Sequence, residues 1–152
     1  MSPLVRLLPI ALCFPIQMYG QSQSSAYVSF AGCYRIVSQT WQPKSEDIKL
    51  IPDRFQLQSK SVFEPGRGMF AVRSVPATDN LNENLWIWQP KRNSFWISWG
   101  TGFGGFRGTF KRSRNGEFVG RVKEWCDSRC EWKRRASTIR IQQIACNLIG
   151  PG

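Results

Sequence analysis

Apolar and polar residues alternate along most of the chain beyond residue 31, and clusters of glycine, proline, asparagine and serine interrupt the alternation at regular intervals. Such alternation is typical of β-strands with one buried face, because successive side chains point to opposite faces of a sheet. Eight short strands at regular spacing favour an all-β fold, either an up-and-down barrel or a sandwich. Of the two, we expect an eight-stranded antiparallel up-and-down β-barrel. The expected strands are Gly32–Trp41, Arg54–Lys60, Met69–Val75, Leu85–Gln89, Ser94–Trp99, Gly105–Arg112, Glu117–Trp125 and Glu131–Ala145.

Two local irregularities are also predicted. Arg114-Asn115-Gly116 is the strongest turn signal, since Asn-Gly supplies the left-handed conformations of a type I′ hairpin turn. The last strand is long and its alternation is imperfect, so we expect a β-bulge near Ala136.

The segment Leu85–Phe106 is exceptionally aromatic, with four tryptophans and three phenylalanines. If its turn is centred on Lys91-Arg92, Trp88 pairs with Phe95 and Trp86 with Ile97, and Trp99 continues the same face. A change of one residue in the turn would exchange the two faces. We expect this face to point into the barrel with Tyr34, Ile36, Phe55, Leu57, Phe70, Phe106 and Phe118, and the other face to carry Leu85, Ile87 and Trp96.

An eight-stranded barrel is just wide enough for side chains to fill it or for one small ligand to enter. The sequence alone leaves two interpretations open, a filled interior and a ligand cavity. The glycine run Gly100–Gly105 is expected to be a loop at the barrel rim rather than a nucleotide-binding loop, because a strand pattern follows it where a nucleotide-binding loop needs a helix. If a ligand binds, this loop forms part of the rim of its site. The candidate ligand-binding residues are Tyr34, Phe55, Phe70, Trp86, Trp88, Phe95, Trp99 and Phe106.

The N-terminus has the layout of a secretory signal peptide. Arg6 supplies the positive charge, Leu7–Ile16 is the apolar run, and small residues at Gly20–Ala26 provide the cleavage region. We expect residues 1–26 to be the signal peptide, residues 27–146 to be a single barrel domain and residues 147–152 to be a flexible tail. Export predicts a secreted or periplasmic protein.

Four cysteines follow the signal peptide, and an even number in an exported chain predicts two disulfides, with three pairings possible. Cys126 and Cys130 flank a three-residue loop, which suits a bridge across a hairpin tip. Cys33 and Cys146 then join the first strand to the last. In a closed barrel with an even number of strands these two strands are antiparallel neighbours, so the predicted bridge and the predicted barrel support each other.

The chain contains no histidine, which removes the commonest general base and the commonest metal ligand. With the cysteines in disulfides, no thiol nucleophile remains. Glu117, Glu124, Asp127 and Glu131 are the remaining catalytic candidates, expected near one end of the barrel, but no spacing selects a pair for glycosidic chemistry. We therefore expect a protein that is not an enzyme and that holds no metal and no cofactor.

The net charge of +11 raises a second functional possibility. Basic clusters beside aromatic residues are features of surfaces that bind polyanions. Export argues against nucleic acid and leaves polysaccharide, anionic lipid headgroups, an acidic protein or simply a solvated basic surface. The candidate contacts are Lys111, Arg112, Arg114, Lys133, Arg134 and Arg135. Charged residues on alternating faces of the last strands also argue against a barrel that spans a membrane. We expect the protein to be a monomer.

Short motifs along the chain carry a family resemblance: Gly32-Cys33-Tyr34-Arg35, Pro52-Asp53-Arg54-Phe55-Gln56-Leu57, Ser98-Trp99-Gly100-Thr101-Gly102-Phe103 and Ile144-Ala145-Cys146. Together they resemble the lipocalin-like (calycin) β-barrels, in particular small exported bacterial domains. Lipocalins proper have Gly-x-Trp where this chain has Gly32-Cys33-Tyr34, and an arginine over that ring, for which Arg140 is the candidate match. The resemblance implies that a small apolar ligand binds in the barrel mouth, with no catalytic residues.

Overall fold

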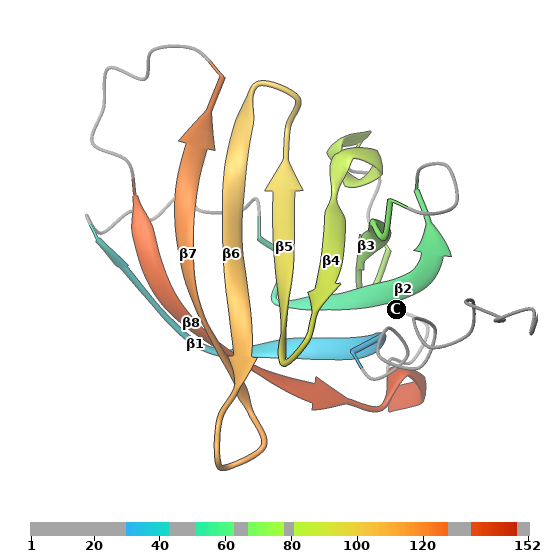
Figure 1. Cartoon of the computed structure of the whole chain (residues 1–152), viewed down its shortest axis with the longest axis vertical. Coiled ribbons are helices and arrows are strands. Elements are labelled where there is room, and N and C mark those ends of the chain that lie inside the picture. The colour runs from blue at the N-terminus through green and yellow to red at the C-terminus, as the bar shows by residue number, and fades with distance from the viewer. Residues whose placement is uncertain (1–29, 43–50, 63–66, 78–80, 128–134, 149–152) are drawn as a thin grey trace, which may run out of the picture.

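The computed structural model describes residues 30–42, 51–62, 67–77, 81–127 and 135–148. Within them, eight antiparallel strands form a closed barrel in which each strand pairs with the next and the last returns to the first (Figure 1). The predicted fold class and strand order are confirmed. The elements are β1 (Gly32–Gln42), β2 (Arg54–Ser61), β3 (Phe70–Ser74), the 3₁₀ turn η1 (Leu81–Leu85), β4 (Ile87–Lys91), β5 (Ser94–Gly100), β6 (Gly104–Arg112), β7 (Phe118–Cys126), β8 (Ala136–Ile144) and the 3₁₀ turn η2 (Cys146–Leu148).

The antiparallel order gives the barrel two different ends. The β5–β6 connection and η1 lie at the upper end in Figure 1, and the β4–β5 and β6–β7 hairpins lie at the lower end. In the part of the chain that the structure describes, no helix is long and apolar enough to cross a membrane.

A disulfide joins the first strand to the region that follows the last. Cys33 in β1 pairs with Ile144 in β8, and the disulfide to Cys146 spans a Cα–Cα distance of 5.2 Å. The predicted Cys33–Cys146 bridge is confirmed. Cys126 also forms a disulfide, but its expected partner Cys130 lies outside the described residues, as does the expected signal peptide.

The aromatic hairpin adopts a register that differs from the predicted one by two residues. Lys91 pairs with Ser94 and Trp88 pairs with Ile97, so the predicted pairing of Trp88 with Phe95 is wrong. The physical reason is Pro90: in the predicted register it would flank the turn, where a backbone N–H must close the hairpin, and proline has none. Because the shift is an even number of residues, the inward face is unchanged.

Two other local predictions are corrected. Register shifts occur in β1 between Ile36 and Ser38 and in β2 between Leu57 and Ser61. By contrast, β8 pairs with both neighbours in continuous register from Ala136 onward, and residues 128–134 lie outside the described residues. At the β6–β7 hairpin, Gly116 alone has a positive φ (86°), and Asn115 does not, so the turn is not type I′. Gly116 donates its N–H to the Ser113 carbonyl (3.2 Å), which gives the longer hairpin loop that ends in a left-handed glycine.

The barrel interior is filled by aromatic rings that contact one another. The rings of Tyr34 and Phe55 stack with centroids 5.7 Å apart, and those of Phe95 and Phe110 stack at 5.5 Å. Gly120 is required by this packing, since a Cβ at that position would lie 2.6 Å from the Phe110 ring. The fully buried large side chains are Trp88, Trp99, Tyr34, Phe55, Phe95, Phe106, Phe110, Phe118, Leu57, Ile97, Ile139 and Ile141.

Candidate functional site

The residues predicted to bind a ligand inside the barrel lie together in this core. All are buried apart from Phe70, which is partly buried and packs on the Trp88 ring with centroids 5.1 Å apart. Trp88 donates its indole N–H to the Gln58 carbonyl (2.9 Å), and Tyr34 donates its hydroxyl to the Phe30 carbonyl (2.7 Å). The Phe95 ring contacts the rings of both Tyr34 and Trp88, which is the arrangement of a packed core.

The upper layer of the core contains two tryptophans whose polar atoms are unsatisfied. Trp86 and Trp99 are 2% and 1% exposed, and neither indole N–H has a hydrogen-bond partner among the described residues. An unpaired buried donor costs about 1–3 kcal/mol. Because so little of either ring is accessible to water, neighbouring atoms cover both rings almost completely.

An apolar groove lies on the outer surface of the barrel. Its lining residues come mainly from β4 to β7, the strands that run side by side in Figure 1. The groove has a volume of about 350 Å³. Trp96 from β5 and Trp125 from β7 are half-buried in its lining, and Leu85 is 48% exposed at its edge. The lining residues are Leu85, Ile87, Trp96, Ser98, Gly100, Gly102, Arg107 and Trp125.

Strand alternation and missing side chains explain why the sequence forms a groove here. Trp96, Ser98 and Gly100 occupy alternate positions of β5 and therefore share its outer face. A Cβ at Gly100 would stand 3.5 Å from Cζ2 of Trp125, and one at Gly102 would stand 3.6 Å from Cδ1 of Leu85. The absent side chains leave the space that Trp125 and Leu85 border.

The rest of the glycine run has a structural role. Gly105 has a φ of 147°, and a Cβ there would lie 2.1 Å from the Trp99 carbonyl oxygen, so only glycine fits. Thr101 donates its backbone N–H to the Gly104 carbonyl (2.8 Å) and closes the loop between β5 and β6. β6 follows this loop directly, as expected for a barrel rim.

Two positively charged residues lie side by side next to the groove. Arg107 of β6 and Lys123 of β7 are direct cross-strand partners, and both are exposed. Neither forms an ion pair with a described carboxylate; the ion pairs in the described chain are Arg135–Glu124 and Arg140–Glu117. The Arg107 guanidinium lies 5.8 Å from the centre of the Trp125 ring, within cation–π range. The indole N–H of Trp125 is buried and has no described partner.

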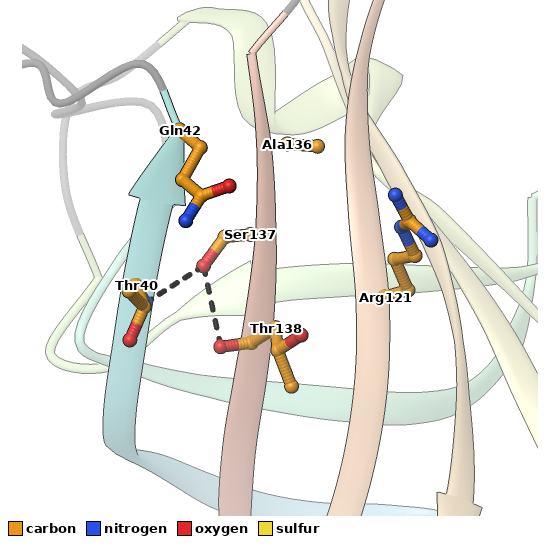
Figure 2. A pocket seen from close by; sticks show the side chains of 6 residues that line it. All are labelled: Thr40, Gln42, Arg121, Ala136, Ser137 and Thr138. Carbon is orange, nitrogen blue, oxygen red and sulfur yellow. Dashed lines mark hydrogen bonds between the residues drawn. The ribbon is translucent and has the colours of Figure 1, made fainter.

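A second hollow on the barrel is lined by residues of β1, β7 and β8. Figure 2 shows its lining, with Gln42 from β1 and Arg121 from β7 on either side of β8. The hydroxyl of Ser137 accepts a hydrogen bond from the Thr40 backbone N–H (2.9 Å) and donates to the Thr138 carbonyl (3.3 Å). The hollow measures about 380 Å³, and most of its exposed lining is polar.

The basic residues predicted to hold a polyanion are not gathered on one surface. Lys111, Arg112 and Arg114 are exposed at the lower end, and the Arg112 guanidinium lies 4.9 Å from the centre of the Phe118 ring. Arg135 precedes β8 at the other end and forms an ion pair with Glu124 (2.7 Å). Lys133 and Arg134 lie outside the described residues.

The carboxylates considered as catalytic are likewise separated. Glu117 precedes β7 and Glu124 lies near its end, so about seven residues of strand, or about 23 Å, separate them. Glycosidases place their two carboxyl groups about 5–10 Å apart, so the expectation that these residues share one end is wrong for Glu117. The Arg140 guanidinium and the Asn115 amide that donate to Glu117 lower its pKa. Glu131 lies outside the described residues, and Asp127 is exposed.

Arg140 does not take the place that the lipocalin resemblance assigns to it. It points outward to Glu117 rather than over Tyr34. Arg112 is the arginine that covers a ring at the lower end. Sequence reasoning also missed Arg107, Lys123 and Trp125 as a group; their common outer face follows from alternation, but their alignment depends on the β6–β7 register.

Comparisons with protein-family models, with curated proteins and with solved structures found no match to this chain. The fold therefore defines the class: a closed, eight-stranded antiparallel barrel with a buried aromatic core, compatible with a lipocalin-like fold.

Proposed function

We propose that this protein is a non-catalytic, exported barrel that binds a small hydrophobic or aromatic ligand. The observation that carries the proposal is the apolar groove between Trp96 and Trp125, with a volume of about 350 Å³. Small-molecule sites are concave and mostly apolar, with a few polar groups that orient the ligand, and they occupy about 300–1,000 Å³. The groove meets each of these conditions.

The packing of the barrel favours this groove over the interior as the binding site. The interior rings contact one another, and Tyr34, Phe55 and Phe95 are fully buried. A ligand among them would have to displace core side chains, which costs several kcal/mol. The groove is already open, and its indoles offer faces on which an aromatic ring can stack.

Export is supported by the covalent chemistry of the chain. The Cys33–Cys146 disulfide links the two edges of the β-sheet where the barrel closes, and disulfides persist mainly in oxidising compartments. The layout of the N-terminal residues is that of a signal peptide. Both features favour a secreted or periplasmic location.

Titration with phenylnaphthylamine, an uncharged aromatic probe that fluoresces in apolar surroundings, tests the proposal. We expect a saturable increase in fluorescence at one site, quenching of tryptophan emission and little dependence on salt. A linear, non-saturable response would contradict ligand binding by the folded barrel.

A second candidate function is the binding of a polyanion such as an acidic polysaccharide, anionic lipid headgroups or an acidic protein. Arg107, Arg121 and Lys123 favour it, because all three are exposed on neighbouring strands and lack an ion pair with a described carboxylate. Retention on heparin that falls steeply with salt is the expected result. Retention that does not depend on salt would count against it.

A further inference from the structure

The pairing of Arg107 with Lys123 places two positive charges side by side on one face of the sheet. Directly opposed residues in an antiparallel pair have Cβ atoms about 4.5–5.5 Å apart, and like charges in this position are destabilising. Neither charge is neutralised by a described carboxylate. An anion bound between them would convert this repulsion into attraction.

The pair also adjoins the apolar groove. Arg107 is itself a lining residue, and its guanidinium lies 5.8 Å from the Trp125 ring centre. In the β-ladder, Ser98 pairs with Arg107 and Arg107 pairs with Lys123, so groove and cations lie in one row across β5, β6 and β7. An apolar body in the groove therefore places any substituent at this edge beside both cations.

We propose that the groove selects an amphipathic anion: a small aromatic or otherwise apolar molecule that carries one carboxylate, sulfonate or phosphate group. The ring stacks between Trp96 and Trp125, and the anionic group contacts Arg107 and Lys123. Arginine suits this role because its planar fork can donate two parallel hydrogen bonds to such a group. This inference rests on the proposed ligand-binding function and specifies its ligand class.

Two probes that share the same fused rings separate the inference from the function on which it rests. Anilinonaphthalene sulfonate carries a sulfonate, and phenylnaphthylamine has no charge. At low salt we expect the sulfonate probe to bind at least about fivefold more tightly than the uncharged probe, and we expect salt to reduce the difference. Both probes should compete for a single site.

Substitutions identify the cations responsible. In each of the single variants Arg107→Gln and Lys123→Gln, we expect the preference for the sulfonate probe over the uncharged probe to fall to about twofold or less. Because Arg107 also lines the groove, the readout is the ratio of the two affinities, and only Lys123→Gln is expected to leave the Kd of the uncharged probe nearly constant. Arg114→Gln is the matched control, because Arg114 is an exposed arginine in the β6–β7 hairpin loop at the opposite end of the barrel, and it should leave both affinities unchanged. Near-ultraviolet circular dichroism establishes that each variant is folded.

The possible results distinguish failure of the inference from failure of the proposed function. If the uncharged probe saturates and the sulfonate probe binds no more tightly, or if the preference survives both substitutions, the inference is overturned and the proposed function stands. Sulfonate binding that persists when the groove is filled by Gly100→Leu would also overturn it, because the anion would then bind to the charged surface alone. If neither probe binds, both the inference and the proposed function fail.

Discussion

Gly100 stands against the indole of Trp125, and a side-chain carbon at position 100 would lie 3.5 Å from Cζ2 of that ring. This is ordinary van der Waals contact, so one methyl group fits and a longer side chain must extend into the groove. Two residues on non-adjacent strands therefore set the depth of the proposed site.

Gly100→Leu should abolish binding of phenylnaphthylamine. The leucine side chain would occupy the groove that the probe needs, and we expect the affinity to fall at least about tenfold. Gly100→Ala is the matched control and should retain the affinity within about twofold, since its methyl group contacts Trp125 without crossing the groove. Full binding by a folded Gly100→Leu variant would place the probe elsewhere.

Gly105→Ala should destabilise the barrel far more than Gly116→Ala. Both glycines have a positive φ, but a Cβ at Gly105 would lie 2.1 Å from the Trp99 carbonyl oxygen, whereas nothing lies within 4 Å at Gly116. The conformational strain of a side chain costs about 1–3 kcal/mol at either position. The clash at Gly105 should add at least about 2 kcal/mol. Urea unfolding measures the difference, and equal losses would refute this account of the glycine run.

Replacing Cys33 and Cys146 with serine should lower the free energy of unfolding by about 4–5 kcal/mol, since the bridge closes a loop of 113 residues. We expect the double variant to remain a barrel at low temperature, because backbone pairing along β1 and β8, from Cys33 to Gln42, also joins the two strands. The measurement is urea unfolding of the oxidised protein beside the double variant. A loss below about 1 kcal/mol would show that the bridge hardly constrains the unfolded chain.

Tyr34 should make the barrel less stable at alkaline pH. Burial raises the pKa of its hydroxyl, and the nearby Arg112 charge offsets this only in part. The unfolded chain loses this proton near pH 10 and the folded chain retains it, so the stabilisation is complete below about pH 10 and declines above it. The expected slope from this group is up to about 1.4 kcal/mol per pH unit.

Tyr34→Phe is the test variant for that pH dependence. It removes the 2.7 Å hydrogen bond to the Phe30 carbonyl and should cost about 1 kcal/mol at pH 8. Above pH 10 the gap between wild type and variant should close, because the variant has no ionisable group at this position. A gap that stays constant between pH 8 and pH 11, or phenolate absorbance from Tyr34 in the folded protein, would contradict the assignment.

The fold could be predicted from the sequence because strand alternation, turn residues and cysteine placement agree with one another. The inward face of the aromatic hairpin was identified even though its register was wrong, since Trp86, Trp88 and Trp99 keep their side of the sheet after a two-residue shift. The predicted Cys33–Cys146 bridge and the predicted closure of the barrel supported each other, because the first and last strands of a closed, even-numbered barrel are antiparallel neighbours.

The candidate groove could not be predicted in the same way. It depends on Gly100 and Trp125 meeting across two strand registers, and on Arg107 lying opposite Lys123. That second alignment is set by the loop at Gly116, whose conformation differs from the expected turn. The alternation of apolar and polar residues predicts which face of the sheet a side chain occupies. It does not predict the register between neighbouring strands, which decides which side chains meet in a site.

The most direct test of the central claim follows the indole N–H resonances of the seven tryptophans by nuclear magnetic resonance during titration with phenylnaphthylamine. Single Trp→Phe variants assign the signals. We predict saturable shifts for Trp96 and Trp125, with Trp88 and Trp99 unmoved. Shifts confined to Trp86 and Trp99 would place the ligand inside the barrel and contradict the account.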